Sequence, residues 1–168
     1  ARPSLLIDIM QVDALRRIQV GPHSAGSEPG PACYGLGGTR PTVTDSDVAL
    51  GKVDPVTFAG GKIPIYADKA AAVLDDVIGG PLSMTTEVAA YGVGEIVDEN
   101  MANAARVHAV ERGVAISKRT LIAFGGAAPL HAGRLAEKLA IGRVIVPSGA
   151  GVGSAIGFLR APAAYETV

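Results

Sequence analysis

Leu121-Ile-Ala-Phe-Gly-Gly-Ala-Ala-Pro-Leu-His131 joins an apolar, strand-like run to a helix-like segment through two adjacent glycines. The surrounding pattern predicts a strand over 120–124, a helix over 130–139 and a second strand over 143–146. Short connections of this kind imply a right-handed crossover between parallel strands. The sequence therefore predicts an α/β fold with a βαβ unit in its last third.

The paired glycines also mark a candidate binding site. A strand-to-helix turn without side chains leaves backbone N–H groups free at a helix N-terminus, which suits a phosphate or a nucleotide. The alternative is that the turn only packs a helix closely against a strand. His131 falls in the first helical turn, where the helix dipole would lower its pKa and keep a neutral imidazole facing a ligand. Its alternative is a buried structural histidine.

The chain divides by composition into a Gly/Pro-rich strand-and-loop region, 1–66, and a region of two helices followed by the βαβ unit, 67–168, within one domain. In the first region we expect strands over 5–10 and 15–20, an ordered loop over 21–38, and a short strand or strand end over 42–45. In the second we expect a helix over 68–78, stopped by Gly79-Gly80-Pro81, and a long helix from 83–87 to Gly113.

Composition excludes several classes of function. A length of 168 residues with 48% hydrophobic content fits one globular domain. The net charge of -1, 4% aromatic content and absence of Trp argue against nucleic-acid binding. The apolar runs are too short for a membrane helix, and no signal pattern precedes them. A single cysteine permits neither an internal disulfide nor a cysteine-rich zinc site, so a cytoplasmic location is the default expectation.

The remaining candidates are weaker as sites. The glycine cluster from Gly149 fails as a dinucleotide fingerprint, because Ser154 stands at its sixth position. The three histidines show no metal-ligand spacing, so no metal site is expected within this chain alone. Cys33 lacks an activating neighbour and fits a packed, apolar role. Asp8 and Asp45 are candidates for a phosphate or metal side, because a buried carboxylate needs a metal, a water network or backbone donors.

Four strings together resemble the hydantoinase A/5-oxoprolinase family. They occur in the family's order and span nearly the whole chain: Val20-Gly-Pro-His-Ser-Ala-Gly-Ser-Glu-Pro-Gly-Pro-Ala-Cys-Tyr-Gly35, Pro41-Thr-Val-Thr-Asp45, Phe124-Gly-Gly-Ala-Ala-Pro-Leu-His-Ala132 and Ser154-Ala-Ile-Gly157. The resemblance implies half of an ATPase of the actin/Hsp70-like (ribonuclease H-like) fold, with a mixed sheet. It also implies ATP and Mg²⁺, or another divalent metal, as cofactors, and makes Gly125, Gly126, Ala127 and Ala128 the adenosine-side loop.

The same resemblance implies a function. Family members activate a substrate carbonyl by phosphorylation, so the expected function is part of an ATP-dependent cyclic amide hydrolase of the hydantoinase/5-oxoprolinase type. An ATP-dependent ketone carboxylase subunit, of the acetone or acetophenone type, is the alternative. Expected partners are the N-terminal half of the same subunit, a hydantoinase B-type subunit and a small amide or ketone substrate.

The sequence departs from the family pattern in two ways, and these departures keep a third function open beside the two enzymes. Family subunits are several times longer, so this chain is similar to their C-terminal portion. The glycine-rich second phosphate loop that usually follows the acid-containing strand is absent after Asp8. A non-catalytic assembly module without phosphate loops therefore remains open beside the two enzymes.

Overall fold

The computed structural model describes residues 7–162 and 164, and it is mostly helical with two small sheets. The chain forms two compact units, residues 1–100 and 101–168. The compositional division at residue 66 therefore falls inside the first unit. Within the described residues, no helix combines the length and the apolar content needed to cross a membrane.

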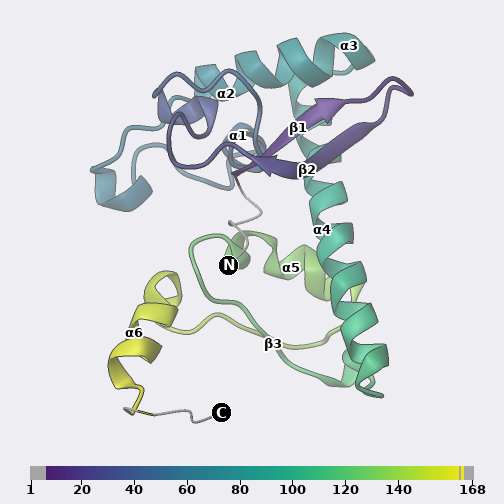
Figure 1. The fold of residues 1–168 in the computed structure, drawn as a ribbon, viewed down its shortest axis with the longest axis vertical. Coiled ribbons are helices and arrows are strands. Elements are labelled where there is room, and N and C mark those ends of the chain that lie inside the picture. The colour runs from purple at the N-terminus through teal and green to yellow at the C-terminus, as the bar shows by residue number, and fades with distance from the viewer. Residues whose placement is uncertain (1–6, 163, 165–168) are drawn as a thin grey trace. The chain divides into compact units, whose positions relative to one another are not determined.

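Figure 1 shows the elements, whose bounds are β1 (Asp8–Val12), β2 (Ile18–Ser24), η2 (Ala32–Tyr34), α1 (Val43–Ala49), η3 (Phe58–Gly61), α2 (Ala67–Leu74), η4 (Asp75–Gly79), α3 (Gly80–Leu82), α4 (Thr86–Glu111), η5 (Ile116–Lys118), β3 (Leu121–Ile122), α5 (Ala128–Lys138), β4 (Val144–Ile145), η6 (Ala150–Val152) and α6 (Gly153–Arg160).

The first unit begins with an antiparallel hairpin of β1 and β2 (Figure 1), in which Met10 pairs with Val20 and Val12 with Ile18. The second strand starts later than the expected 15–20, because Asp13 organises a turn there. Its carboxylate accepts hydrogen bonds from the N–H groups of Leu15 and Arg17, both at 2.9 Å. The start of the expected first strand, residues 5 and 6, lies outside the described residues.

The expected strand over 42–45 is wrong. Thr42 is the N-cap of α1, and Thr42 and Asp45 form a reciprocal capping box. Asp45 N–H donates to Thr42 Oγ1 at 3.4 Å, and Thr42 N–H donates to the Asp45 carboxylate at 2.8 Å. These bonds satisfy donors that a helix start otherwise leaves open, so the segment turns into a helix. Thr42 keeps only an isolated antiparallel bridge to Ile9.

The Gly/Pro-rich loop between β2 and α1 is ordered, as expected, and covers a small core. Cys33 on η2 is fully buried against Val48, Ile65 and Ala70. Tyr66 N–H donates to the Cys33 carbonyl at 2.8 Å, which joins this loop to the start of α2. The loop is therefore an ordered part of the first unit and not a linker.

The helix expected over 68–78 continues beyond its predicted stop at Gly79-Gly80-Pro81. Both glycines have right-handed helical angles. In the π-helical turn η4, Gly80 N–H donates to the Asp75 carbonyl, so the hydrogen-bond register has already shifted before Pro81, which has no N–H. The run ends at Ser83, in the left-handed conformation at φ 58°. The long helix α4 and its end before Gly113, at φ 62°, are confirmed.

The second unit contains the predicted βαβ arrangement. Strands β3 and β4 are parallel, with Leu121 opposite Val144 and Ile122 opposite Ile145, and α5 connects them. Both strands are shorter than the sequence predicts. The helix α6 follows the glycine cluster that begins at Gly149.

Candidate functional site

The connection from β3 to α5 forms an open turn. Gly125 has φ 94°, a conformation that favours glycine, and its N–H donates to the Ala150 carbonyl at 2.7 Å. Ala127 is the N-cap of α5 and supplies no side-chain cap, and Pro129 in the first turn has no N–H of its own. The helix therefore begins without a side chain covering its positive end, which is the arrangement that accepts an anionic or polar ligand group.

Space is open at both glycines of this turn. An added Cβ at Gly125 or Gly126 would meet no atom within 4 Å. Unlike Gly125, Gly126 does not have a positive φ, so its conformation is not the left-handed one that favours glycine. Gly126 and Ala128 are exposed, and Ala127 is half-buried. The described residues therefore leave room for a ligand at the turn, and packing in this unit does not require a glycine at 126.

His131 lies on the same helix but not on its open surface. Its side chain is 2% exposed, and it is buried together with Ala132 and Ala136 of α5. This burial favours the structural alternative for His131 over the ligand-facing one.

Asp45 is fully buried, and its carboxylate is occupied by donors from its own unit. It accepts hydrogen bonds from the N–H groups of Ala32, Cys33 and Thr42 and from the Thr42 hydroxyl, at 3.3, 2.8, 2.8 and 2.8 Å. A buried carboxylate needs a metal, a water network or backbone donors, and for Asp45 the structure shows backbone donors. Asp45 holds the Gly/Pro-rich loop on the start of α1, and these contacts lend no support to a metal or phosphate role.

Asp8 is half-buried at the start of β1, opposite Ser24. Burial raises the pKa of its carboxyl group, because the charged form loses hydration. Its carboxylate lies against the backbone of Gly21, where an added Cβ would be 3.6 Å from Asp8 Oδ2. In the described part of the chain, no group of three or more His, Cys, Asp and Glu side chains is placed to hold a metal ion.

Cys33 has the environment of a packed residue. It is fully buried, and burial raises the pKa of its thiol, with the nearby Asp45 carboxylate adding to the rise. A neutral, inaccessible thiol is a poor nucleophile. The packing role predicted for Cys33 agrees with this geometry.

The structure thus brings Gly125, Gly126, Ala127 and Ala128 together in one turn of the second unit, while Asp8 and Asp45 belong to different surroundings in the first. Sequence reasoning missed Arg40, which lines a cavity under the Gly/Pro-rich loop. No local signal marks it, because the cavity forms only when β1, β2 and the loop fold together.

A sequence profile described as hydantoinase/oxoprolinase matches residues 8–167. The acetophenone carboxylase gamma subunit of Aromatoleum aromaticum is 50% identical over 115 residues, which are 68% of this chain and 16% of that protein. A nucleotide-free acetone carboxylase structure, from a study of ATP-dependent acetone carboxylation, has a TM-score of 0.84 at 29% identity and is matched over 90% of this chain and 22% of its own. The ATP-dependent caprolactamase of Pseudomonas jessenii has a TM-score of 0.82 at 38% identity, with the same coverage of 90% and 22%. The chain therefore spans less than a quarter of the length of these relatives.

Proposed function

The chain belongs to the hydantoinase/oxoprolinase family, and on that basis we propose that it forms the nucleotide-side part of an ATP-dependent enzyme that activates a substrate carbonyl by phosphorylation. The observation that carries the proposal is the open turn at Gly125–Ala128. It combines a helix N-terminus without a side-chain cap and glycines with free space around them. We assign this turn to the adenosine side of the nucleotide.

The chain's own residues have a positioning role in this proposal. The N–H groups at the start of α5 would donate to the nucleotide, and the bond from Gly125 to Ala150 fixes the approach of the turn. ATP, when bound, supplies the phosphoryl group that turns a poor carbonyl electrophile into a reactive ester, a step that depends mainly on positioning and charge neutralisation. The described residues contain no group of three or more His, Cys, Asp and Glu side chains placed to hold a metal ion, and we assign no residue of this chain to Mg²⁺.

The fate of the activated carbonyl distinguishes two enzymes. The resemblance read from the sequence favours hydrolysis of a cyclic amide, and the 38% identity to an ATP-dependent caprolactamase supports it. The 50% identity to an acetophenone carboxylase gamma subunit supports the alternative, a ketone carboxylase. Both enzymes share the nucleotide step that the turn would serve.

We further propose that this chain functions within a larger assembly of the actin/Hsp70-like ATPase fold, with an N-terminal half and a hydantoinase B-type subunit as its partners. The second unit supports this, because it exposes large apolar side chains. Phe124 and Ile122 are 53% and 57% exposed, and Phe158 and Leu159 are 82% and 81% exposed. Apolar surface of this extent is typical of a face that is covered in the functional protein.

The proposal is tested with the native subunit, after its intact mass has shown how long the polypeptide is. Phosphate release from ATP is measured with a cyclic amide alone and with a ketone plus bicarbonate. Release that depends on the cyclic amide, together with ring opening, supports the hydrolase. Release that requires both the ketone and bicarbonate supports the carboxylase. A subunit that binds no nucleotide in the presence of its partner would instead be an assembly module.

A further inference from the structure

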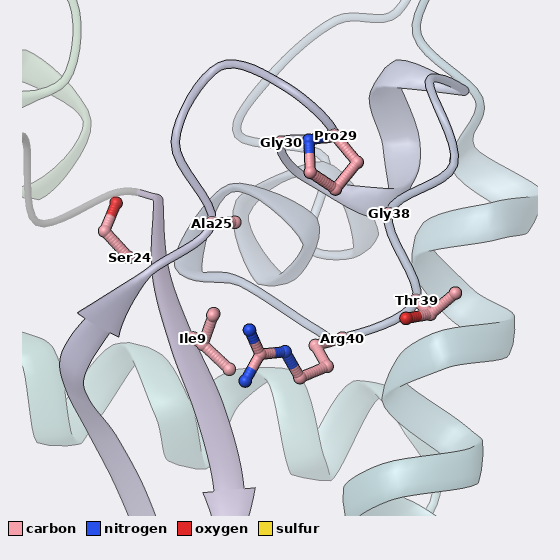
Figure 2. Close-up of a pocket in the computed structure, with 8 residues that line it drawn as sticks. All are labelled: Ile9, Ser24, Ala25, Pro29, Gly30, Gly38, Thr39 and Arg40. Atoms are coloured by element: carbon pink, nitrogen blue, oxygen red, sulfur yellow. The ribbon is translucent and has the colours of Figure 1, made fainter.

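A cavity of about 290 Å³ lies in the first unit, between the start of β1, the end of β2 and the Gly/Pro-rich loop. Its walls belong to segments far apart in the sequence, as Figure 2 shows, and consist of Ile9, Ser24, Ala25, Pro29, Gly30, Gly38, Thr39 and Arg40. This volume is just below the range of about 300–1,000 Å³ for ligand pockets, so the cavity fits a small ligand or one group of a larger one.

Hydrogen bonds hold the walls of this cavity on several sides. Ala25 N–H donates to the Ile7 carbonyl at 2.8 Å, and Gly30 N–H donates to the Ala25 carbonyl at 3.3 Å. On the opposite side, Met10 N–H donates to the Pro41 carbonyl at 2.9 Å. These hydrogen bonds join both ends of the loop to β1 or to the residue just before it. The cavity is therefore preformed, and binding a ligand would not require the loop to become ordered.

The glycines of the wall cannot carry side chains. An added Cβ at Gly30, where φ is 68°, would lie 2.8 Å from the Ser27 carbonyl oxygen, and one at Gly38 would overlap the Gly30 carbonyl oxygen. The backbone segments around Gly30 and Gly38 therefore lie close together on this side of the cavity. A larger residue at either position does not fit.

Arg40 is the one charged residue among the eight that line the cavity. Figure 2 shows its guanidinium extending toward Ile9, beneath Ala25. In the described part of the chain, its side chain makes no hydrogen bond or ion pair. Ser24 Oγ accepts the Gly26 N–H at 3.2 Å, and Figure 2 shows it pointing away from Arg40. The cavity thus offers a guanidinium fork, and none of its eight lining residues is a carboxylate.

We propose that this cavity binds a small oxyanion, a phosphate or a carboxylate group, with Arg40 as the principal ligand-binding residue and the neighbouring Thr39 hydroxyl as a second donor. The planar guanidinium can donate two parallel hydrogen bonds to a phosphate or to a carboxylate. The experiment below distinguishes the two groups. The cavity residues belong to the first unit and the Gly125–Ala128 turn to the second, and the two share no residue, so the proposal is tested independently of the proposed function.

The test measures anion binding to the native subunit by isothermal titration calorimetry, with inorganic phosphate in one arm and acetate in the other. Arg40→Gln should weaken binding of the preferred anion at least tenfold. Arg40→Lys should weaken it less, because an ammonium retains the charge without the fork. Arg112→Gln is the matched control, because Arg112 is also exposed and does not line the cavity. It should leave binding unchanged.

A preference for phosphate or for acetate supports the proposal in either case and identifies the source of the oxyanion. Binding that is unchanged in Arg40→Gln, or no binding of either anion, would overturn it. Phosphate could also occupy the nucleotide turn, so the titration is repeated in Gly126→Val. The Arg40-dependent binding should persist in that background, even where the nucleotide site has been lost. Thermal melts of each variant show that it is folded.

Discussion

Gly126→Val separates the nucleotide-binding hypothesis from a packing role for the same turn. Gly126 does not adopt a positive φ, and an added Cβ would meet nothing within 4 Å. The substitution should therefore change the free energy of unfolding by no more than about 0.5 kcal/mol. Its branched side chain would, however, occupy the space through which the adenosine approaches the start of α5.

We expect the nucleotide affinity of the native subunit to fall at least tenfold in this variant, equivalent to about 1.4 kcal/mol of binding free energy. Titration calorimetry with ATP measures the affinity, and urea unfolding measures the stability. Gly125→Ala is a poorer test, because its φ of 94° makes any side chain strained, and a cost of about 1–2 kcal/mol in stability would accompany the change.

Gly142→Val is the matched control for Gly126→Val. Gly142 precedes β4, has no positive φ and has equally open surroundings. It should change neither affinity nor stability. If Gly126→Val binds ATP as tightly as the unchanged subunit while remaining folded, the turn does not hold the nucleotide, and its glycines serve the connection between strand and helix.

Three further predictions concern the first unit. Asp45→Ala leaves four donors without their acceptor and should lower the free energy of unfolding by about 3 kcal/mol or more in urea titrations; a loss below 1 kcal/mol would contradict the capping role. Gly38→Ala should be about 1–3 kcal/mol less stable than Gly142→Ala, because only the first places a methyl group against the Gly30 carbonyl, and equal stabilities would refute this contact. Burial raises the pKa of Cys33 above its ordinary value of 9.0, so above that pH the unfolded chain ionises before the folded one, and stability should fall by up to about 1.4 kcal/mol per pH unit. Cys33→Ala should remove that part of the pH dependence, and an unchanged dependence in the variant would mean that the thiol does not cause it.

The parts of the fold that sequence predicted correctly are those that local pattern determines. Apolar periodicity, a Ser/Thr cap near its start and Gly113 at its end identified α4, and the strand-like runs on either side of 130–139 identified the βαβ unit. Segment 42–45 was misread because Thr-Val-Thr favours a strand by residue type, whereas the threonine and the aspartate three residues later form a capping box. The [Ser/Thr]-x-x-[Asp/Glu] spacing was present in the sequence, and the hydrogen bonds it makes outweigh strand propensity there.

Site residues were harder to predict, because residue type alone does not tell what a side chain or a glycine contacts. Asp45 and Asp8 are both acids near strand-like runs, yet one is held by backbone donors and the other lies half-buried against Gly21. Arg40 carried no signal at all, since its significance depends on the cavity beside it.

The glycines of this chain show the same limit and indicate how to overcome it. Gly38 is explained within the first unit, because an adjacent carbonyl leaves no space for a side chain. Gly126 has no such explanation, but neither has Gly142, so open space alone does not indicate a ligand. What distinguishes Gly126 is its place before a helix that begins without a side-chain cap. If a nucleotide is what requires glycine there, the same substitution must be harmless at Gly142 and must abolish binding at Gly126, whereas a turn that serves only packing gives two equivalent variants.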